Sequence, residues 1–102
     1  MFRIYKIERS NVKELKNILA SNPYDDNSFA RKGYTLREGK SLNLDEEFYY
    51  LFINADEDFI KFADERLKNI AIILNGEEFD KARQIYEDME NAAQQGFGAL
   101  FG

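Results

Sequence analysis

The stretch that decides the fold is EFYYLFINA, residues 47–55. Large apolar or aromatic side chains occupy every position from 48 to 53. A strand that alternates between apolar and polar residues buries one face, whereas a run that is apolar throughout has to be covered on both. The run therefore predicts a central β-strand. We expect helices to cover one of its faces, and a second subunit or the C-terminal tail to cover the other.

Before this strand, residues 1–8 alternate in a way that predicts a first strand. A helix follows, because Val12, Leu15, Ile18 and Leu19 form one apolar stripe at helical spacing. We expect Ser10 or Asn11 to cap it, since Asn11 and Glu14 have the spacing of a capping box. The helix ends before Pro23, because proline disfavours helical backbone at the residue that precedes it.

Residues 29–38 read as a further extended segment. Phe29, Tyr34 and Leu36 are its apolar positions, and Gly33 is the expected site of a bulge. The pair Glu38-Gly39 marks a turn that leads toward the central strand.

After the central strand, Asp56 is the expected N-cap of a helix. Residues 70–74 are ambiguous: the spacing of Leu67, Ile70 and Leu74 favours continuation of this helix, whereas the β-branched isoleucines favour a short buried strand. We expect helix here and keep the strand as the alternative. A last helix is expected from near Gly76 to about Gln95, with an apolar seam at alternating spacings of three and four.

These elements predict a single α+β domain over residues 1–95, with an antiparallel sheet of three to four strands and helices mainly on one face. If residues 70–74 form a strand, the expected order becomes ferredoxin-like, βαββαβ, followed by a C-terminal helix. Residues 96–102 stand apart from the domain as an apolar, glycine-rich tail.

Composition narrows the range of functions. The chain of 102 residues contains no histidine and no cysteine, which excludes Ser-His-Asp and Cys-His catalysis, disulfides and an ordinary zinc site. Its apolar runs are too short to span a bilayer, and its charged N-terminal segment does not read as a signal peptide, so we expect a cytoplasmic protein without membrane contact. The formal net charge of −5 is uneven: residues 1–43 carry +4 and residues 44–102 carry −9.

Carboxylates cluster at four places, and hard cations such as Mg²⁺ prefer oxygen ligands. The clusters are Asp25-Asp26, Asp45-Glu46-Glu47, Asp56-Glu57-Asp58 and Glu77-Glu78. None has the spacing of a calcium loop, and the last two lie at expected helix starts, where acidic residues are common. We therefore expect no metal site, no cofactor and no catalytic residues, and keep a magnesium-dependent enzyme or a small-molecule binder as an alternative.

A second alternative is binding of single-stranded nucleic acid by the segment 29–40. Its sequence partly matches an aromatic-strand motif of RNA-recognition domains, and bases stack on aromatic side chains that are flanked by basic ones. The net acidity of the chain works against phosphate binding. The candidate patch consists of Phe29, Arg31, Lys32, Tyr34, Arg37 and Lys40.

The tail is the strongest indication of function, because three large apolar side chains lie there among glycines and without charged neighbours. Such a segment is typical of an interaction rather than of a reaction. We predict a homo-oligomeric or interaction module in which the tail serves assembly. The expected interface residues are Gly96, Phe97, Gly98, Leu100 and Phe101.

The layout resembles a family of small, uncharacterised archaeal proteins of unknown function. The resemblance lies in the N-terminal strand, in FYYLFINADEDFIKFADERL (residues 48–67), in the acidic last helix and in the ending GFGALFG (residues 96–102). It implies an archaeal, cytosolic α+β domain with no assigned activity, and it transfers no catalytic residues.

Overall fold

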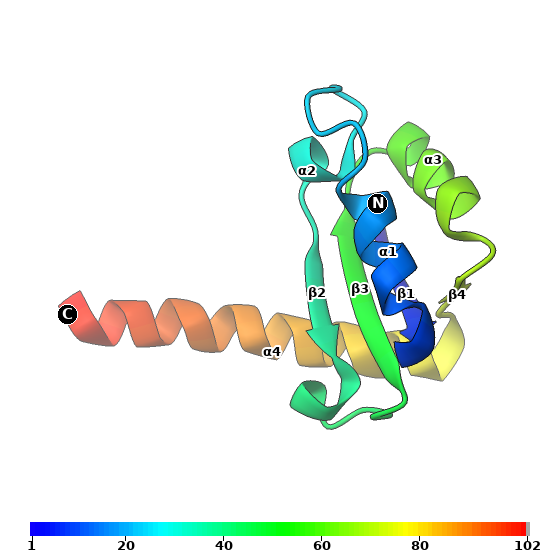
Figure 1. Ribbon diagram of the computed structural model, residues 1–102. Helices are drawn as coiled ribbons and strands as arrows, with labels where there is room; N and C mark the ends of the chain where they lie inside the picture. The colour runs from blue at the N-terminus through cyan, green and yellow to red at the C-terminus, as the bar shows by residue number, and fades with distance from the viewer. Residues whose placement is uncertain (102) are drawn as a thin grey trace.

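The computed structural model describes the backbone of residues 1–101 and the side chains of residues 1–93. Four strands form one antiparallel sheet in the order β2-β3-β1-β4 (Figure 1). The strands are β1 (Phe2–Glu8), β2 (Thr35–Glu38), β3 (Phe48–Asn54) and β4 (Ala71–Ile73). The helices are α1 (Val12–Leu19), α2 (Phe29–Lys32), α3 (Glu57–Leu67) and α4 (Gly76–Phe101), with short 3₁₀ turns η1 (Arg9–Asn11) and η2 (Gly39–Leu42). The predicted α+β class is confirmed.

The topology is the ferredoxin-like alternative, β1-α1-β2-β3-α3-β4, followed by α4. The strand β3 is central, as predicted: it pairs with β1 on one side and with β2 on the other. Alternate residues of the sheet enter two separate cores. One holds Tyr5, Leu51 and Ile53 together with residues of α1 and α3.

The second core lies on the opposite face of the sheet and holds Ile4, Tyr50 and Phe52. Its cover is α4, which contributes Phe79, Ala82, Ile85, Tyr86 and Met89. The expectation that a second subunit or the tail covers this face is therefore wrong. The helical seam of residues 79–89 matches an apolar sheet face in the same chain, and docking it there requires no other molecule.

The expectation of helix over residues 70–74 is also wrong, because Ala71–Ile73 form β4 and pair with Tyr5–Ile7 of β1. The Leu74 N–H extends this pairing by donating to the Ile4 carbonyl at 2.9 Å. Local spacing favoured the helix, but the free edge of β1 offers the β-branched isoleucines a strand partner that is invisible in the local pattern.

The segment that begins at Phe29 is not a strand at its start. Ser28 caps the short helix α2 by accepting from the Arg31 N–H at 3.2 Å. Gly33 ends this helix with φ of +86°, a backbone conformation that glycine adopts without strain, so it is a helix terminator and not a bulge. Phe29 is buried in the first core, with its ring centroid 5.3 Å from that of Phe59.

Of the two helix caps expected from the sequence, the one on α3 forms as predicted and the capping box on α1 does not. Asp56 caps α3 as predicted, accepting from the Phe59 N–H at 3.3 Å. Asn11 is the N-cap of α1 but makes no side-chain capping bond, so the expected capping box does not form. The 3₁₀ turn η1 directly precedes α1 and sets its start instead.

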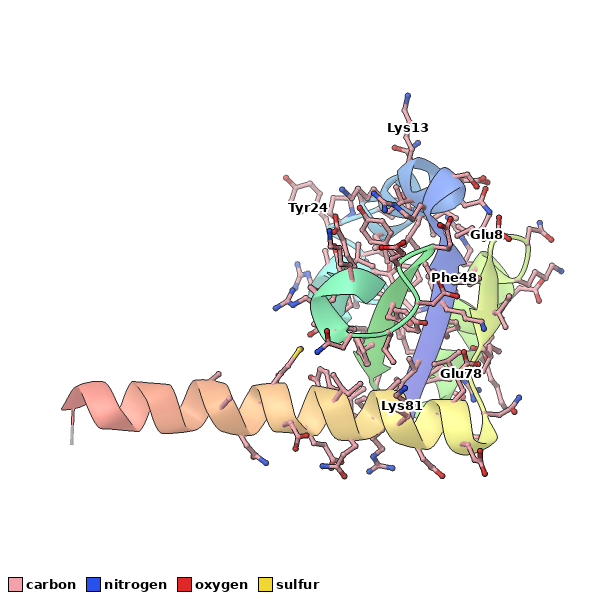
Figure 2. The ribbon with its side chains drawn as sticks, turned by 90° about the horizontal axis from the view of Figure 1, so that it is seen from below. Glu8, Lys13, Tyr24, Phe48, Glu78 and Lys81 are labelled. Atoms are coloured by element: carbon pink, nitrogen blue, oxygen red, sulfur yellow. The ribbon has the colours of Figure 1, made fainter. Side chains whose placement is uncertain are left out.

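The helix α4 is longer than expected, since it continues past Gln95 to Phe101. Its 26 residues span about 39 Å at 1.5 Å per residue, close to the longest dimension of the molecule, 43 Å. Figures 1 and 2 show that α4 crosses the sheet with its first half and extends beyond the edge at β2 with its second.

Candidate interaction surface

The first half of α4 is fixed to the sheet by aromatic side chains. The Tyr86 ring stacks on that of Phe52, with centroids 4.9 Å apart, and lies 5.3 Å from that of Phe2. Phe79 meets the Phe2 ring edge-on at 6.2 Å. Offset and edge-on pairs of this kind contribute about 0.5–1.5 kcal/mol each beyond the area that they bury. They set the direction in which the rest of the helix runs.

Charged groups line the border of this contact. Lys6 Nζ lies 2.9 Å from Glu78 Oε2, and the Arg83 guanidinium lies over the Phe2 ring at 5.5 Å from its centroid. These pairs are partly or largely exposed, so each contributes little to stability. They help to specify the position of α4 along the strands.

Beyond Met89 the helix leaves the sheet. The side chains of Asn91, Ala92 and Ala93 are exposed, and Glu90 is the last charged residue of the sequence. Figure 2 shows the second half of α4 extending clear of the strands. An α-helix in a globular domain is stabilised mainly by packing of one face, and here the exposed residues 91–93 make no such packing.

A groove lies where α4 leaves the sheet. It has a volume of about 300 Å³ and lies between η2 and the next residue on one side and α4 on the other. Leu42 forms its buried floor, while Ile85 and Met89 are half-buried and Ala92 is exposed. Its lining residues are Ser41, Leu42, Asn43, Ile85, Asp88, Met89 and Ala92.

The predicted interface residues of the tail lie at the far end of α4. The backbone of Gly96, Phe97, Gly98, Leu100 and Phe101 is helical, and their side chains lie outside the described residues. Gly102 lies outside the described chain altogether. The predicted role of these residues in assembly therefore stays a prediction.

The predicted nucleic-acid patch is not one surface. Phe29 is only 2% exposed, so it is unavailable for base stacking; this part of the prediction is wrong. Tyr34 is 43% exposed, and the four basic residues are exposed as well. They are spread along the edge at β2: Arg31 and Lys32 lie in α2 at one end, and Lys40 lies in η2 at the other (Figure 1). Arg37 lies within β2.

Two of these basic groups also have acidic neighbours. Arg31 lies 4.0 Å from an Asp26 oxygen, and Lys32 lies 4.0 Å from an Asp56 oxygen. Partial neutralisation and dispersal both weaken the attraction that this edge exerts on a phosphate backbone.

A cluster of hydrogen-bonded polar side chains that the sequence did not predict joins β1 to α3. Asp64 of α3 accepts from Arg3 through both carboxylate oxygens, at 3.2 and 2.8 Å, and from the Tyr5 hydroxyl at 2.6 Å. The alternation of β1 places Arg3 and Tyr5 on one face, but only the fold brings Asp64 over them. Burial and the hydrogen bond to Asp64 raise the pKa of the Tyr5 hydroxyl, so the phenol stays neutral at ordinary pH.

This cluster borders a cavity of about 200 Å³ that Leu67, Ala71 and Ile73 also line. Every polar group of the cluster already has a partner within it: the guanidinium neutralises the carboxylate, and the phenol donates to it. The arrangement fixes α3 on the sheet.

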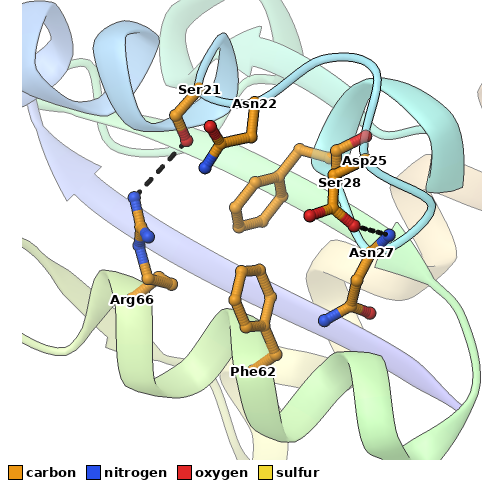
Figure 3. A pocket seen from close by; sticks show the side chains of 8 residues that line it. Ser21, Asn22, Asp25, Asn27, Ser28, Phe62 and Arg66 are labelled. Carbon is orange, nitrogen blue, oxygen red and sulfur yellow. Dashed lines mark hydrogen bonds between the residues drawn. The ribbon is translucent and has the colours of Figure 1, made fainter.

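A smaller polar pocket of about 100 Å³ lies between the loop after α1 and the helix α3 (Figure 3). Arg66 reaches across it and donates to Ser21 Oγ at 3.4 Å, while Asp25 accepts from the Asn27 N–H at 2.9 Å. Its volume is below the range of about 300–1,000 Å³ that is usual for organic ligands. The pocket is therefore too small for most organic ligands.

Metal sites and membrane-spanning helices are both absent from the part of the chain that the structure describes. No group of three or more carboxylates there has the geometry of a metal site. No helix there has the length and apolarity to cross a membrane. Outside α4, the exposed aliphatic side chains of Ile72 and Ile73 lie on the edge strand β4 and are 52% and 38% exposed.

Comparisons of the chain with models of protein families, with curated proteins and with solved structures found no match.

Proposed function

We propose that the protein is a non-enzymatic, cytoplasmic module that associates with a second copy of itself through the half of α4 that extends beyond the sheet. The observation that carries the proposal is the extension itself: residues 76–89 dock on the domain, and the helix then continues for twelve residues past Met89. The absence of histidine and cysteine and the fully paired state of the Asp64 cluster support a function without catalysis.

The energetics of the segment favour a partner. Gly96 and Gly98 together cost a helix about 2 kcal/mol relative to alanine. Burying Phe97, Leu100 and Phe101 contributes about 1.5–3 kcal/mol each, so partial burial of the three already exceeds that cost. A partner surface therefore stabilises the helical extension, whereas water does not.

A second copy is a suitable partner because symmetry repeats each contact. In a two-fold pair the three apolar side chains are buried twice, for a sum of about 9–18 kcal/mol. Association itself costs about 4–15 kcal/mol. One copy of the contact contributes about 4.5–9 kcal/mol and offsets only the lower part of that range, whereas the repeated contact offsets most of it.

The test is light scattering coupled to gel filtration, with the full chain compared with a chain that ends at Gln95. We expect the full chain to have twice its monomer mass of 12.0 kDa and the shortened chain to be monomeric, with an unchanged circular-dichroism spectrum apart from the lost helical turns. The double substitution Phe97→Ala with Phe101→Ala serves as a variant of full length. The same number of subunits in the full and shortened chains would refute the proposal.

The matched control is Ile72→Ala, which removes an exposed aliphatic side chain of β4 and leaves α4 intact. We expect it to associate like the unmodified chain. Loss of association in this variant alone would place the interface at the β4 edge instead.

A further inference from the structure

We propose that the groove between η2 and α4 receives residues 97–101 of a second copy, so that the two α4 helices pair antiparallel. The inference rests on the proposed self-association and specifies its geometry. It starts from the groove, whose apolar floor is the buried Leu42 and whose lining includes the half-buried Ile85 and Met89. An apolar floor of this kind favours an apolar occupant.

The helix cannot supply that occupant to its own groove. Met89 lines the groove, and Leu100 lies eleven residues further along the same continuous helix. At 1.5 Å per residue this separation is about 16 Å, directed away from the domain. The apolar end therefore reaches a groove of this kind only on another copy.

Charge decides the direction of pairing. Residues 76–90 of α4 contain six carboxylates and two basic groups, and residues 91–101 contain no charge. Parallel pairing in register through the helix face that lines the groove places Asp88 beside its own copy, and like charges at such distances repel. Antiparallel pairing places the uncharged end of one helix beside the acidic part of the other and avoids this repulsion.

The length of the segment sets the register. If Met89 of one chain faces Leu100 of the other, the centre of the pair lies between residues 94 and 95, and Asp88 faces Phe101 in the uncharged end. The Asp88 carboxylate and the polar groups of Ser41 and Asn43 then form the rim of the contact. A hydrophobic centre with a polar rim is the usual composition of a protein interface.

The chain contains no cysteine, so single cysteines can report the geometry. An Asn43→Cys chain is mixed with a Leu100→Cys chain and oxidised, and the mixed disulfide is followed on a non-reducing gel; Ala99→Cys and Phe101→Cys sample neighbouring registers. A disulfide requires Cα atoms about 4.4–6.8 Å apart. Of the three chains with a cysteine at position 99, 100 or 101, we expect the fastest to cross-link with Asn43→Cys about a hundredfold faster than with the control chain described below. The reason is that the effective concentration within a complex is far above that of free chains.

The control replaces Asn43→Cys by Lys13→Cys, which points away from α4 in Figure 2. If light scattering shows association but cross-linking is no faster than in this control, the proposed contact with the groove is overturned and the proposed function is not. A monomer at all concentrations would refute both. An Asp88→Cys chain cross-links readily with itself only in a parallel pair, so rapid formation of that disulfide would overturn the antiparallel arrangement.

Discussion

Replacing Tyr86 by alanine tests whether packing of α4 on the sheet contributes to the stability of the fold. The direction of α4 depends on this packing. Tyr86 makes two ring contacts, to Phe52 and Phe2, and is half-buried. The two contacts contribute about 1–3 kcal/mol, and complete truncation of a buried large aromatic residue costs about 3–5 kcal/mol. Because Tyr86 is only half-buried, we expect a loss of about 2–3 kcal/mol in the free energy of unfolding.

In a domain of this size 1 kcal/mol corresponds to a shift of about 4 °C in the melting temperature, so Tyr86→Ala should melt about 8–12 °C lower. Thermal unfolding followed by circular dichroism measures the shift. The matched control is Tyr24→Ala, because Tyr24 is 89% exposed and its loss should leave the melting temperature unchanged. If both variants melt together, the docking of α4 contributes nothing to stability and the argument for its fixed direction fails.

Three further substitutions test the fold. Gly39→Ala should destabilise by at least about 2 kcal/mol in urea unfolding, because a Cβ there meets the backbone carbonyl of Asp45; a normal midpoint would contradict the close approach. Asp56→Ala removes the cap on the Phe59 N–H and should cost about 1 kcal/mol by the same measurement. Folding raises the pKa of Tyr5 above its ordinary value of 10.0, so the unfolded chain loses that proton first and stability falls as pH rises past 10. Unfolding across this range should show a shallower fall for Tyr5→Phe than for the unmodified chain; equal slopes would contradict the assigned cause.

The sequence predicts those parts of the fold whose signals are local. The continuous apolar run of β3, the alternation of β1 and the helical stripe of α1 each carry enough pattern to specify an element. The predictions that were wrong concern elements whose structure depends on partners distant in the sequence. Residues 71–73 become a strand because β1 has a free edge, and residues 79–89 become the second cover because they fit the other face of the sheet.

The candidate sites divide in the same way. Phe29 is an aromatic residue of the kind that stacks on bases. However, the Ser28 cap and the terminating Gly33 make its segment a short helix, and this helix buries the Phe29 side chain. The Asp64 cluster joins residues about sixty positions apart, so no local pattern reveals it. The apolar tail was visible in sequence, whereas the groove proposed to receive it requires η2 and α4 to be placed side by side.

The division of the interior by the sheet has a consequence for how substitutions combine. Ile4 and Tyr5 are neighbours in sequence but belong to different cores. Effects of substitutions in the separate cores, such as Leu15→Ala and Ala82→Gly, should therefore add to within about 0.3–0.5 kcal/mol, while pairs within one core should be coupled. One side of the sheet can consequently change its packing over evolutionary time without compensating changes on the other, so that the direction of α4 and the packing of α1 and α3 are free to diverge independently.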